Sequence, residues 1–547
     1  MFQVPPPPPS ELPEVVVTGA RLPPAASEAA FSVIRLDDRD LRDQPRLDEA
    51  LRAVPAVSLF RRTSSLSANP TTQGISLRAI APSGAGRTLV TLDGVPLNDP
   101  FGGWVIWSQA PTESLSGLDI VRGAGAGPYG SGALTGVIQL RERDQGAAVD
   151  ASLAEHGGAR LSASGGDRFG GVRLVGSALY ETSDGYVPVR GPAAGAADTP
   201  LDLAVMSAAL RADLPAGPAV VSLRASAFEE DRGSGLAGAR ATASGNALSA
   251  TAAVQPSAER AGWRLQVWRR ESDLANSSAA VAADRATTTP ANDQFETPAV
   301  GWGLNAALRH VVVSGVARVE WELGADARRF EGETRERFRY MAGEFTRGRV
   351  AGGETSVAGL YAEGSWASGP WLVAGGLRAD HWENRDGVRR EFDLADGSPT
   401  LNETDPARSG EVVSARLAAR RELADGHAVR AAAYSGFRPA TLNELHRPFR
   451  VGNDLTEANA ALEPERLKGV ELGWSWTGDR AAVSATLFRN EIDDAIVNVT
   501  LAEGPGTFPR AGFVPAGGVL RQRQNAGRIT ATGVEAEARF DRAETPS

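Results

Sequence analysis

From residue 146 onward, apolar and polar residues alternate along the chain with a period of two. In residues 317–324, for example, Ala317, Val319, Trp321 and Leu323 are apolar, and the residues between them are charged or glycine. Successive side chains of a β-strand point to opposite faces of the sheet, so the pattern predicts strands with one apolar and one polar face. The same alternation recurs at 263–268, 413–420 and 534–540. We expect about sixteen such strands between residues 146 and 540.

The segments between these strands fall into two length classes. Short links that suit tight turns lie at 157–158, 215–217, 368–370, 425–426 and 478–479. Long polar segments lie at 184–200, 271–298, 331–354, 384–410, 440–468 and 500–525. Loops longer than about 12–15 residues are uncommon in compact soluble domains, whereas a membrane β-barrel has short turns at one end and long loops at the other. The pattern therefore favours a membrane barrel with a polar lumen over a soluble β-sandwich.

The first 145 residues lack this alternation. Residues 1–13 are rich in proline and are expected to be extended. Leu41, Leu47, Leu51 and Val54 recur at spacings near three and four, which predicts one or two helical turns. Short apolar strands separated by glycine-rich loops follow, so this region is expected to form a smaller α+β domain.

Two groups of motifs in this region carry a resemblance to a known family. Residues 74–78 read Gly-Ile-Ser-Leu-Arg, 87–94 read Arg-Thr-Leu-Val-Thr-Leu-Asp-Gly, and 118–123 read Leu-Asp-Ile-Val-Arg-Gly. Their order resembles the plug domain of TonB-dependent outer-membrane receptors. Residues 14–19, Glu-Val-Val-Val-Thr-Gly, resemble the TonB box of the same family.

The resemblance implies an all-β transmembrane barrel with an N-terminal α+β plug domain inside its lumen. We expect a proline-rich segment with the TonB box at 1–22, the plug at 23–145 and the barrel at 146–547. Members of the family have about 22 strands. A sixteen-stranded barrel, about 32 Å wide, would leave too little room for a plug about 34 Å across. The chain also ends in a turn at 544–547, so we expect about six C-terminal strands to be missing.

Net charge, hydrophobicity and the N-terminal sequence further limit the possible partners and membrane-targeting features of the chain. The formal net charge is −10 and no basic stripe stands out, so nucleic acid is not an expected partner. No stretch reaches the roughly 18–20 apolar residues of a membrane helix. The N-terminus, Met-Phe-Gln-Val before five prolines, has neither the basic nor the apolar region of a signal peptide. We therefore expect the chain to begin near the mature N-terminus.

The sequence contains no catalytic motif that we recognise. Residues 125–130 match G-x-G-x-x-G, but no helix and no βαβ unit follow them, so we do not predict a dinucleotide loop there. The chain has five histidines and no cysteine, and neither His-x-x-x-His nor Gly-x-Ser-x-Gly occurs. We predict no catalytic residues, no bound metal and no cofactor. The eleven tryptophans suit the aromatic girdles of a membrane barrel.

By resemblance, the TonB box would bind TonB by adding a β-strand to it. The residues concerned are Glu14, Val15, Val16, Val17, Thr18 and Gly19. TonB would act with the energising complex of the inner membrane. Taken without the plug behind it, the same segment could equally form the first strand of the plug.

A second group of residues is expected to bind the ligand at the plug apex. They are Arg61, Arg62, Asn98, Asp99, Phe101, Trp104 and Trp107. Two tryptophans, a phenylalanine and polar groups suit the floor of an extracellular vestibule. The alternative is that these side chains only pack the plug against the barrel, and the sequence does not decide between the two.

A third group is expected to join the plug to the barrel. Arg78 and Arg122 end plug strands, and Glu471 and Glu535 lie on the polar face of barrel strands. By resemblance they form the arginine–glutamate cluster of the family; the alternative is ordinary lumen charge. Ala79 stands where the family usually has glycine, so the sequence does not determine the conformation of the turn after Arg78.

Two further segments resemble paired boxes that flank an extracellular loop in these receptors. They are residues 437–446, Phe-Arg-Pro-Ala-Thr-Leu-Asn-Glu-Leu-His, and 459–465, Asn-Ala-Ala-Leu-Glu-Pro-Glu. Haem receptors place a histidine between such boxes, and His446 lies there. Such a histidine is more often a surface residue than a haem ligand.

The resemblance implies active, TonB-dependent uptake of a scarce, bulky nutrient across the outer membrane. A ferric siderophore is the first expectation, as an extracellular metal chelate, followed by cobalamin and then haem or an oligosaccharide. We expect a monomer surrounded by outer-membrane lipid and lipopolysaccharide. A passive porin and a soluble β-rich enzyme are the alternatives, and both conflict with the plug and box motifs.

Overall fold

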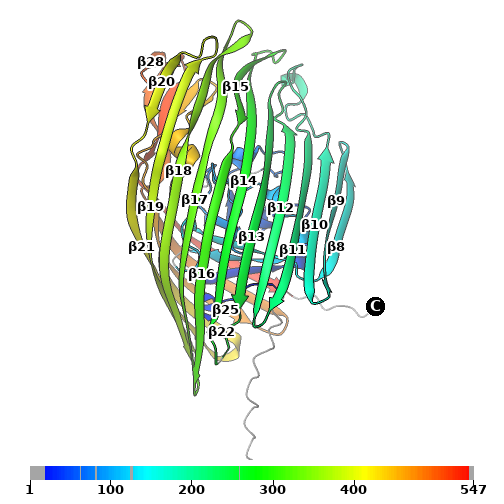
Figure 1. Cartoon of the computed structure of the whole chain (residues 1–547), viewed down its shortest axis with the longest axis vertical. Coiled ribbons are helices and arrows are strands. Elements are labelled where there is room, and N and C mark those ends of the chain that lie inside the picture. The colour runs from blue at the N-terminus through cyan, green and yellow to red at the C-terminus, as the bar shows by residue number, and fades with distance from the viewer. Residues whose placement is uncertain are drawn as a thin grey trace, which may run out of the picture.

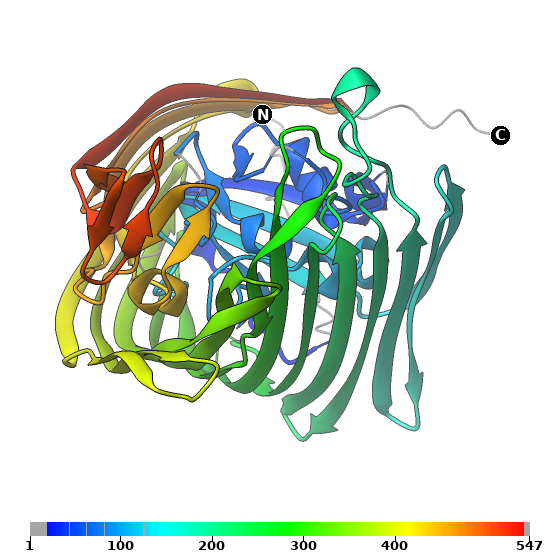
Figure 2. The ribbon, with the colours of Figure 1, turned by 90° about the horizontal axis from the view of Figure 1, so that it is seen from above.

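The computed structural model describes residues 19–42, 44–61, 63–80, 83–123, 127–257 and 259–540. A tall β-barrel surrounds a small N-terminal domain, which lies inside the barrel (Figures 1 and 2). Among these residues, no helix is long and apolar enough to cross a membrane. The fold is therefore the plugged barrel that the alternation and the plug motifs predict.

The N-terminal domain is built on a five-stranded sheet with the strand order β1-β6-β7-β4-β5. Strands β4 and β7 pair in parallel, and the other pairs are antiparallel. Its elements are β1 (Ser32–Asp37), α1 (Asp38–Arg42), α2 (Leu47–Arg52), β2 (Val57–Leu59), β3 (Ile75–Leu77), β4 (Leu89–Leu92), β5 (Val95–Pro96), β6 (Leu115–Arg122) and β7 (Gly136–Glu142).

The core of this domain lies between the two helices and the sheet. The predicted helical residues Leu41, Leu47 and Leu51 are buried there, with strand residues such as Ile120 and Ile138. Four short 3₁₀ segments complete the described part of the domain, at Ala26–Ala30, Pro70–Thr72, Trp107–Gln109 and Thr112–Ser114. This core is internal to the domain, which contacts the barrel both through polar and ionic side chains and through smaller apolar clusters, such as Phe31 and Leu134 against Leu467.

The barrel sheet contains eighteen described strands, and β31 lies next to β8 in the strand order. Two of them, β15 and β20, are additions within a connection, because β14 also pairs with β16 and β19 with β21. The strands are β8 (Gly146–Ala154), β9 (Gly158–Phe169), β10 (Val172–Ser183), β11 (Leu203–Ala216), β12 (Ala219–Gly233), β13 (Arg240–Val254), β14 (Gly262–Val281), β15 (Thr288–Glu296), β16 (Ala299–Ser314), β17 (Ala317–Met341), β18 (Glu344–Ser368), β19 (Trp371–Asp393), β20 (Pro399–Thr404), β21 (Arg408–Glu422), β22 (His427–Arg438), β25 (Glu465–Thr477), β26 (Ala481–Asp493) and β31 (Arg528–Phe540).

The outer face of the barrel is apolar across its middle and aromatic near one end. Leu360 on β18 and Leu377 on β19 are 69% and 63% exposed, whereas their neighbours Tyr361 and Arg378 point inward and are buried. Exposed tryptophans lie close to the short-turn ends of their strands, at Trp263, Trp366, Trp371 and Trp474. An apolar band beside an aromatic girdle is the surface of a membrane barrel.

Most of the long polar segments are paired strands rather than irregular loops. Strands β17 and β18 have 25 residues each and stay paired to their common turn, which makes them about 80 Å long. A transmembrane strand needs only about 9–11 residues. The upper halves therefore project beyond the apolar band, where continued pairing satisfies backbone groups that a loop would leave to water.

Most of the short turns gather at the opposite end, although the two-residue turn at 342–343, between β17 and β18, lies at the long-loop end. Two-residue turns join β11 to β12 at 217–218, β16 to β17 at 315–316 and β18 to β19 at 369–370. The turn at Gly157 lies instead at the long-loop end, because the Asp184 amide, at the start of a long connection, donates to the His156 carbonyl oxygen (2.8 Å). The sequence interpretation grouped Gly157 with the short turns, and that placement is wrong.

Above the barrel, the last two long connections form a small cap at the long-loop end. A four-stranded sheet with the order β23-β24-β30-β27 and a two-stranded sheet β28-β29 lie there beside the helix α3. The elements are α3 (Leu442–His446), β23 (Phe449–Val451), β24 (Asp454–Glu457), β27 (Ile496–Glu503), β28 (Gly506–Phe508), β29 (Gly512–Val514) and β30 (Val519–Asn525).

The position of the apolar band can be tested with a matched pair of substitutions. Leu360→Arg places a charge near the middle of the band and should lower the free energy of unfolding in lipid vesicles by about 2–4 kcal/mol. Val451→Arg, at a site 68% exposed in the cap, should change it by less than about 0.5 kcal/mol. Equal effects in urea titrations would contradict the assigned band.

Candidate functional site

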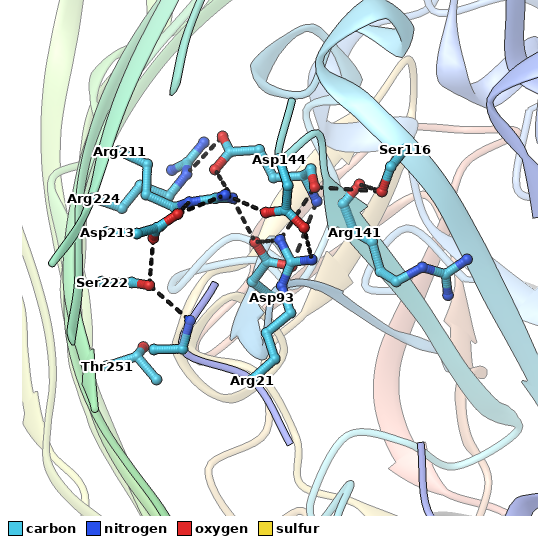
Figure 3. A network of polar contacts seen from close by, with 12 residues as sticks. Arg21, Asp93, Ser116, Arg141, Asp144, Arg211, Asp213, Ser222, Arg224 and Thr251 are labelled. Carbon is cyan, nitrogen blue, oxygen red and sulfur yellow. Dashed lines mark hydrogen bonds and ion pairs between the residues drawn. The ribbon is translucent and has the colours of Figure 1, made fainter. Parts of the chain in front are cut away.

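The chain enters the described region through a polar clamp at the short-turn end of the barrel (Figure 3). Arg21 donates through Nη2 to Asp93 Oδ2 (2.9 Å) and through Nη1 to Asp144 Oδ2 (3.2 Å). Asp93 lies between β4 and β5, and Asp144 lies in the link from plug to barrel. Arg211 of β11 pairs with Asp144 and, at 3.0 Å, with Glu142. One arginine thus ties the N-terminal segment to the plug and to the link.

The segment that follows is fastened along the barrel wall. The Ala20 amide donates to Ser222 Oγ (2.9 Å), and the Arg309 guanidinium donates to the Pro23 carbonyl oxygen. Further on, the Ala26 amide donates to Glu320 Oε1 (3.0 Å). Of the six predicted TonB-box residues, only Gly19 is described, and it is buried. Glu14, Val15, Val16, Val17 and Thr18 lie outside the described residues.

The predicted plug–barrel residues meet in one buried cluster. Arg78 Nη1 lies 2.6 Å from Glu471 Oε2, and its Nε lies 3.5 Å from Glu535 Oε2. Arg122 Nη1 lies 2.7 Å from the same Glu535 oxygen and 2.6 Å from Glu537 Oε1. The structure therefore brings Arg78, Arg122, Glu471 and Glu535 together and adds Glu537.

Two further side chains in this cluster were not found from the sequence. The Arg78 guanidinium donates to the Tyr434 hydroxyl (2.5 Å), and Arg430 pairs with Glu471. Both come from barrel positions that carry no motif. The backbone is left-handed at Arg78 (φ 58°) and at Ala79 (φ 54°), a region that costs a non-glycine residue about 1–2 kcal/mol. The chain therefore forms this turn without a glycine, at a cost in conformational free energy.

A second buried ionic chain links the plug to the cap. Arg87 Nη2 of the plug lies 2.7 Å from Glu465 Oε1, and Arg438 Nε lies 2.7 Å from Glu465 Oε2. Arg438 also pairs with Glu444 of α3 (2.9 Å). None of these residues is among the site residues predicted from the sequence, although three of them lie in the two boxes at 437–446 and 459–465. The resemblance of these two segments to the paired boxes of the family was the sequence signal that could have identified them.

Glu444 also fixes the start of α3. Its carboxylate accepts from the Thr441 amide (2.9 Å), and the Thr441 hydroxyl accepts from the Glu444 amide, which forms a capping box. Burial acts to raise its pKa, but the adjacent Arg438 guanidinium outweighs burial and holds the pKa of Glu444 at about 2. This stabilisation is present above the ordinary value of 4.5 and is lost only as the pH falls towards 2.

A cavity of about 1410 Å³ lies between the plug apex and the cap. Its floor is plug residues, among them Phe60, Arg61, Arg87 and Trp104. Its walls come from the upper halves of β17–β19, from α3 and from the cap sheets. Of the predicted ligand residues, Arg61 and Trp104 line this cavity. Arg62 lies outside the described residues.

The other predicted ligand residues lie elsewhere. The Asn98 side chain accepts from the Val90 amide (2.8 Å), and the Asp99 carboxylate accepts from the Phe101 amide (2.9 Å) and from Ser272 Oγ (2.8 Å). Phe101 packs with Leu442 between plug and cap, and Trp107 belongs to the plug core. Asn98, Asp99, Phe101 and Trp107 thus have the packing role that was the alternative to ligand binding. The polar groups of this loop are satisfied largely within the loop itself.

His446 is also placed away from the cavity. Its ring is 4% exposed, and Nδ1 lies 3.0 Å from Asp405 Oδ2. The ring packs so closely against Gly353 and Gly387 that a Cβ at either glycine would meet it within 3 Å. His446 is therefore neither a surface residue nor positioned to reach a ligand in this cavity. It joins α3 to the barrel wall.

The buried arginine cluster predicts that the plug loosens when one cation is removed. Arg78→Met takes away a guanidinium that is 1% exposed and should cost on the order of 3 kcal/mol. Amide hydrogen exchange in β3 and β4 would then accelerate. Arg35→Gln is the control, because Arg35 is exposed and its partner Asp119 keeps Arg141. Equal exchange in the two variants would contradict a role for the cluster in holding the plug.

Comparisons with known proteins agree with this architecture. The family model described as "TonB dependent receptor-like, beta-barrel" matches residues 194–543, and that of the "TonB-dependent Receptor Plug Domain" matches residues 25–137. The vitamin B12 transporter BtuB of Vibrio cholerae is 29% identical over 179 residues, which is 31% of this chain and 28% of that relative.

Two solved structures illustrate the fold. The ferric yersiniabactin uptake receptor FyuA from Yersinia pestis has a TM-score of 0.67 at 16% identity, covering 96% of this chain and 78% of that chain. The hemophore receptor HasR of Serratia marcescens, solved with its hemophore HasA and heme, has a TM-score of 0.70 at 14% identity, covering 94% and 80%. At these identities the likeness concerns the fold alone. Since the barrel model alone covers more than half of the sequence, the chain belongs to the family of TonB-dependent receptors.

Proposed function

We propose that this protein takes up a scarce, bulky nutrient through the outer membrane by TonB-dependent active transport. The observation that carries the proposal is the cavity of about 1410 Å³ above a plugged lumen. A ligand of several hundred cubic ångströms fits such a cavity, and the plug below it bars passive entry. A ferric siderophore is the first candidate substrate.

The N-terminal clamp supports the energised step. We propose that residues 14–19 add a strand to TonB and that pulling on them first draws on Arg21. Because Arg21 pairs with both Asp93 and Asp144, force applied at the N-terminus reaches the plug sheet and the plug–barrel link at the same point.

The ionic chain from cap to plug supports the signalling step. Glu444, Arg438, Glu465 and Arg87 connect α3, which borders the cavity, to the plug. A ligand that shifts α3 would alter the electrostatic field at Arg87. We propose that binding of the ligand is transmitted to the plug in this way. We also propose that the protein acts as a monomer surrounded by outer-membrane lipid and lipopolysaccharide.

Cobalamin is the second candidate substrate, because the vitamin B12 transporter of Vibrio cholerae is similar to part of this chain. That match spans about a third of this chain and a smaller share of the relative. Haem would need binding groups other than His446, which does not line the cavity. A passive porin is disfavoured, because the plug domain occupies the lumen (Figure 2).

The proposal predicts that binding and uptake separate when residues 14–18 are deleted. In cells that lack their own siderophore and cobalamin receptors, this chain should restore uptake of iron chelate or cobalamin only when TonB is present. Deletion of 14–18 should abolish uptake and leave ligand binding unchanged. Uptake that persists without TonB would overturn the proposal in favour of passive entry.

The clamp generates a separate prediction about TonB affinity in the absence of ligand. Arg21→Gln removes two ion pairs and should increase the binding of the periplasmic domain of TonB by about fivefold or more. Arg52→Gln, an exposed arginine on α2, is the control and should leave binding unchanged. Isothermal titration with the purified receptor measures both; unchanged affinity in Arg21→Gln would show that the clamp does not restrain the segment.

A further inference from the structure

The wall of the cavity carries a large excess of arginine. Among the described residues that line it, nine are arginines and three are glutamates, and none is aspartate or lysine. The chain as a whole has a net charge of −10, so the sign of the cavity is opposite to that of the protein. A concave site lined with one sign of charge concentrates ligands of the other sign.

The three glutamates are already neutralised by arginine. Glu336 lies 2.8 Å from Arg349 and 2.6 Å from Arg447, and Glu391 lies 2.8 Å from Arg349. Glu444, the third, pairs with Arg438 as described above. No carboxylate of the described lining is therefore left to attract a cationic ligand.

Four arginines of the cavity form no ion pair within the described ranges. They are Arg61, Arg339, Arg450 and Arg523. Arg61 and Arg339 are exposed to the cavity, whereas Arg523 is 6% exposed and donates only to the carbonyl oxygens of Asn443 (2.8 Å) and Arg447 (2.7 Å). These four provide the uncompensated positive charge of the site.

Two members of this set, the buried Arg523 and the exposed Arg450, are held beside other cations at an energetic cost. Burial lowers the pKa of Arg523 to about 10, with Arg447 acting in the same direction, and the carboxylates of Glu444 and Glu457 offset this only in part. The side chain of Arg450 is exposed, yet partial desolvation lowers its pKa as well, and Arg349 adds to the effect. Cations crowded beside other cations at an open cavity are stabilised when an anion binds between them.

The remaining lining indicates what kind of anion fits. Phe60, Trp104, Phe338, Phe449 and Phe513 supply aromatic faces, and the buried Trp104 indole N–H has no hydrogen-bond partner among the described residues. The described lining contains no histidine, cysteine or methionine, the side chains that select a bare transition-metal ion. A metal would therefore have to enter already wrapped in an organic ligand.

We propose that this cavity binds an anionic metal chelate whose outer surface carries carboxylate or catecholate oxygens, with Arg61, Arg339, Arg450 and Arg523 as the groups that select its charge. The proposal rests on the proposed transport function and names its substrate class. Planar guanidinium groups suit carboxylate and catecholate oxygens because they donate two parallel hydrogen bonds, and the aromatic faces suit the rings of a catecholate.

Binding to the purified, detergent-solubilised full chain tests the proposal directly. The probes are an anionic ferric catecholate, an anionic ferric citrate, an uncharged ferric hydroxamate, cyanocobalamin and free Cu²⁺. At least one of the two anionic chelates should bind, and its dissociation constant should rise with ionic strength. Tight binding of the hydroxamate, cyanocobalamin or Cu²⁺, with no binding of either anionic chelate, would overturn the proposal.

Substitutions then test which arginines select the charge of the ligand. The double variant Arg61→Gln/Arg339→Gln removes two exposed cations without breaking an ion pair of the described chain and should weaken anion binding by about tenfold to a hundredfold. Arg523→Gln should weaken it similarly, and Arg523→Lys should retain part of the affinity. The control is Arg390→Gln, because Arg390 is exposed on β19 and does not line the cavity. Equal losses in the control and the double variant would contradict the assignment.

Binding in detergent and uptake in cells separate this inference from the transport proposal. An anionic chelate that binds but enters cells equally without TonB would support the cavity chemistry and contradict the transport mechanism. TonB-dependent uptake of an uncharged ligand, with no binding of anions, would support transport and contradict the charge selection.

Discussion

The position of the plug depends on buried ion pairs between its arginines and the carboxylates of the barrel wall. The main apolar core of the plug is internal to that domain, and the contact with the barrel combines these ion pairs with smaller apolar clusters. Burying an ion pair gains little over an apolar contact of the same shape, yet removing one partner costs several kcal/mol. Pairs such as Arg78–Glu471 and Arg87–Glu465 therefore fix where the plug lies more than they stabilise the fold. A domain held in this way can be displaced if the charges keep partners as it moves.

These polar contacts form three groups at different heights of the lumen. The clamp around Arg21, drawn in Figure 3, lies near the short turn between β11 and β12. The Arg78 cluster lies on the plug flank, and the Arg87–Glu465–Arg438 chain leads to the cap. A pull applied at the N-terminus and a ligand bound at the apex would thus act on opposite ends of one set of charges. Coupling between the two sites needs only that one group of pairs weakens when another is disturbed.

The sequence was sufficient for the architecture and for part of the site. Strand alternation predicts the barrel because it depends on local pattern alone, and the arginines 78 and 122 follow from short motifs. The long polar segments were interpreted as loops, since composition does not show that β17 and β18 remain paired to their tips. The Arg87–Glu465 pair was missed because its members are 378 residues apart and no resemblance marked them as partners, as it did for Arg78 and Glu471. The charge of the cavity could not be anticipated, because its lining comes from many separate segments.

The projecting strands have a consequence for the thermodynamics of ligand capture. Because the cavity walls include the paired upper halves of β17, β18 and β19, much of the binding surface is ordered before a ligand arrives. Binding then loses little conformational entropy of the protein, and the main cost is the removal of water from the ligand and from the arginines. Such a receptor would associate rapidly with an anion at low ionic strength. Its affinity would depend strongly on salt concentration and less on temperature, because few loops have to become ordered when the ligand binds.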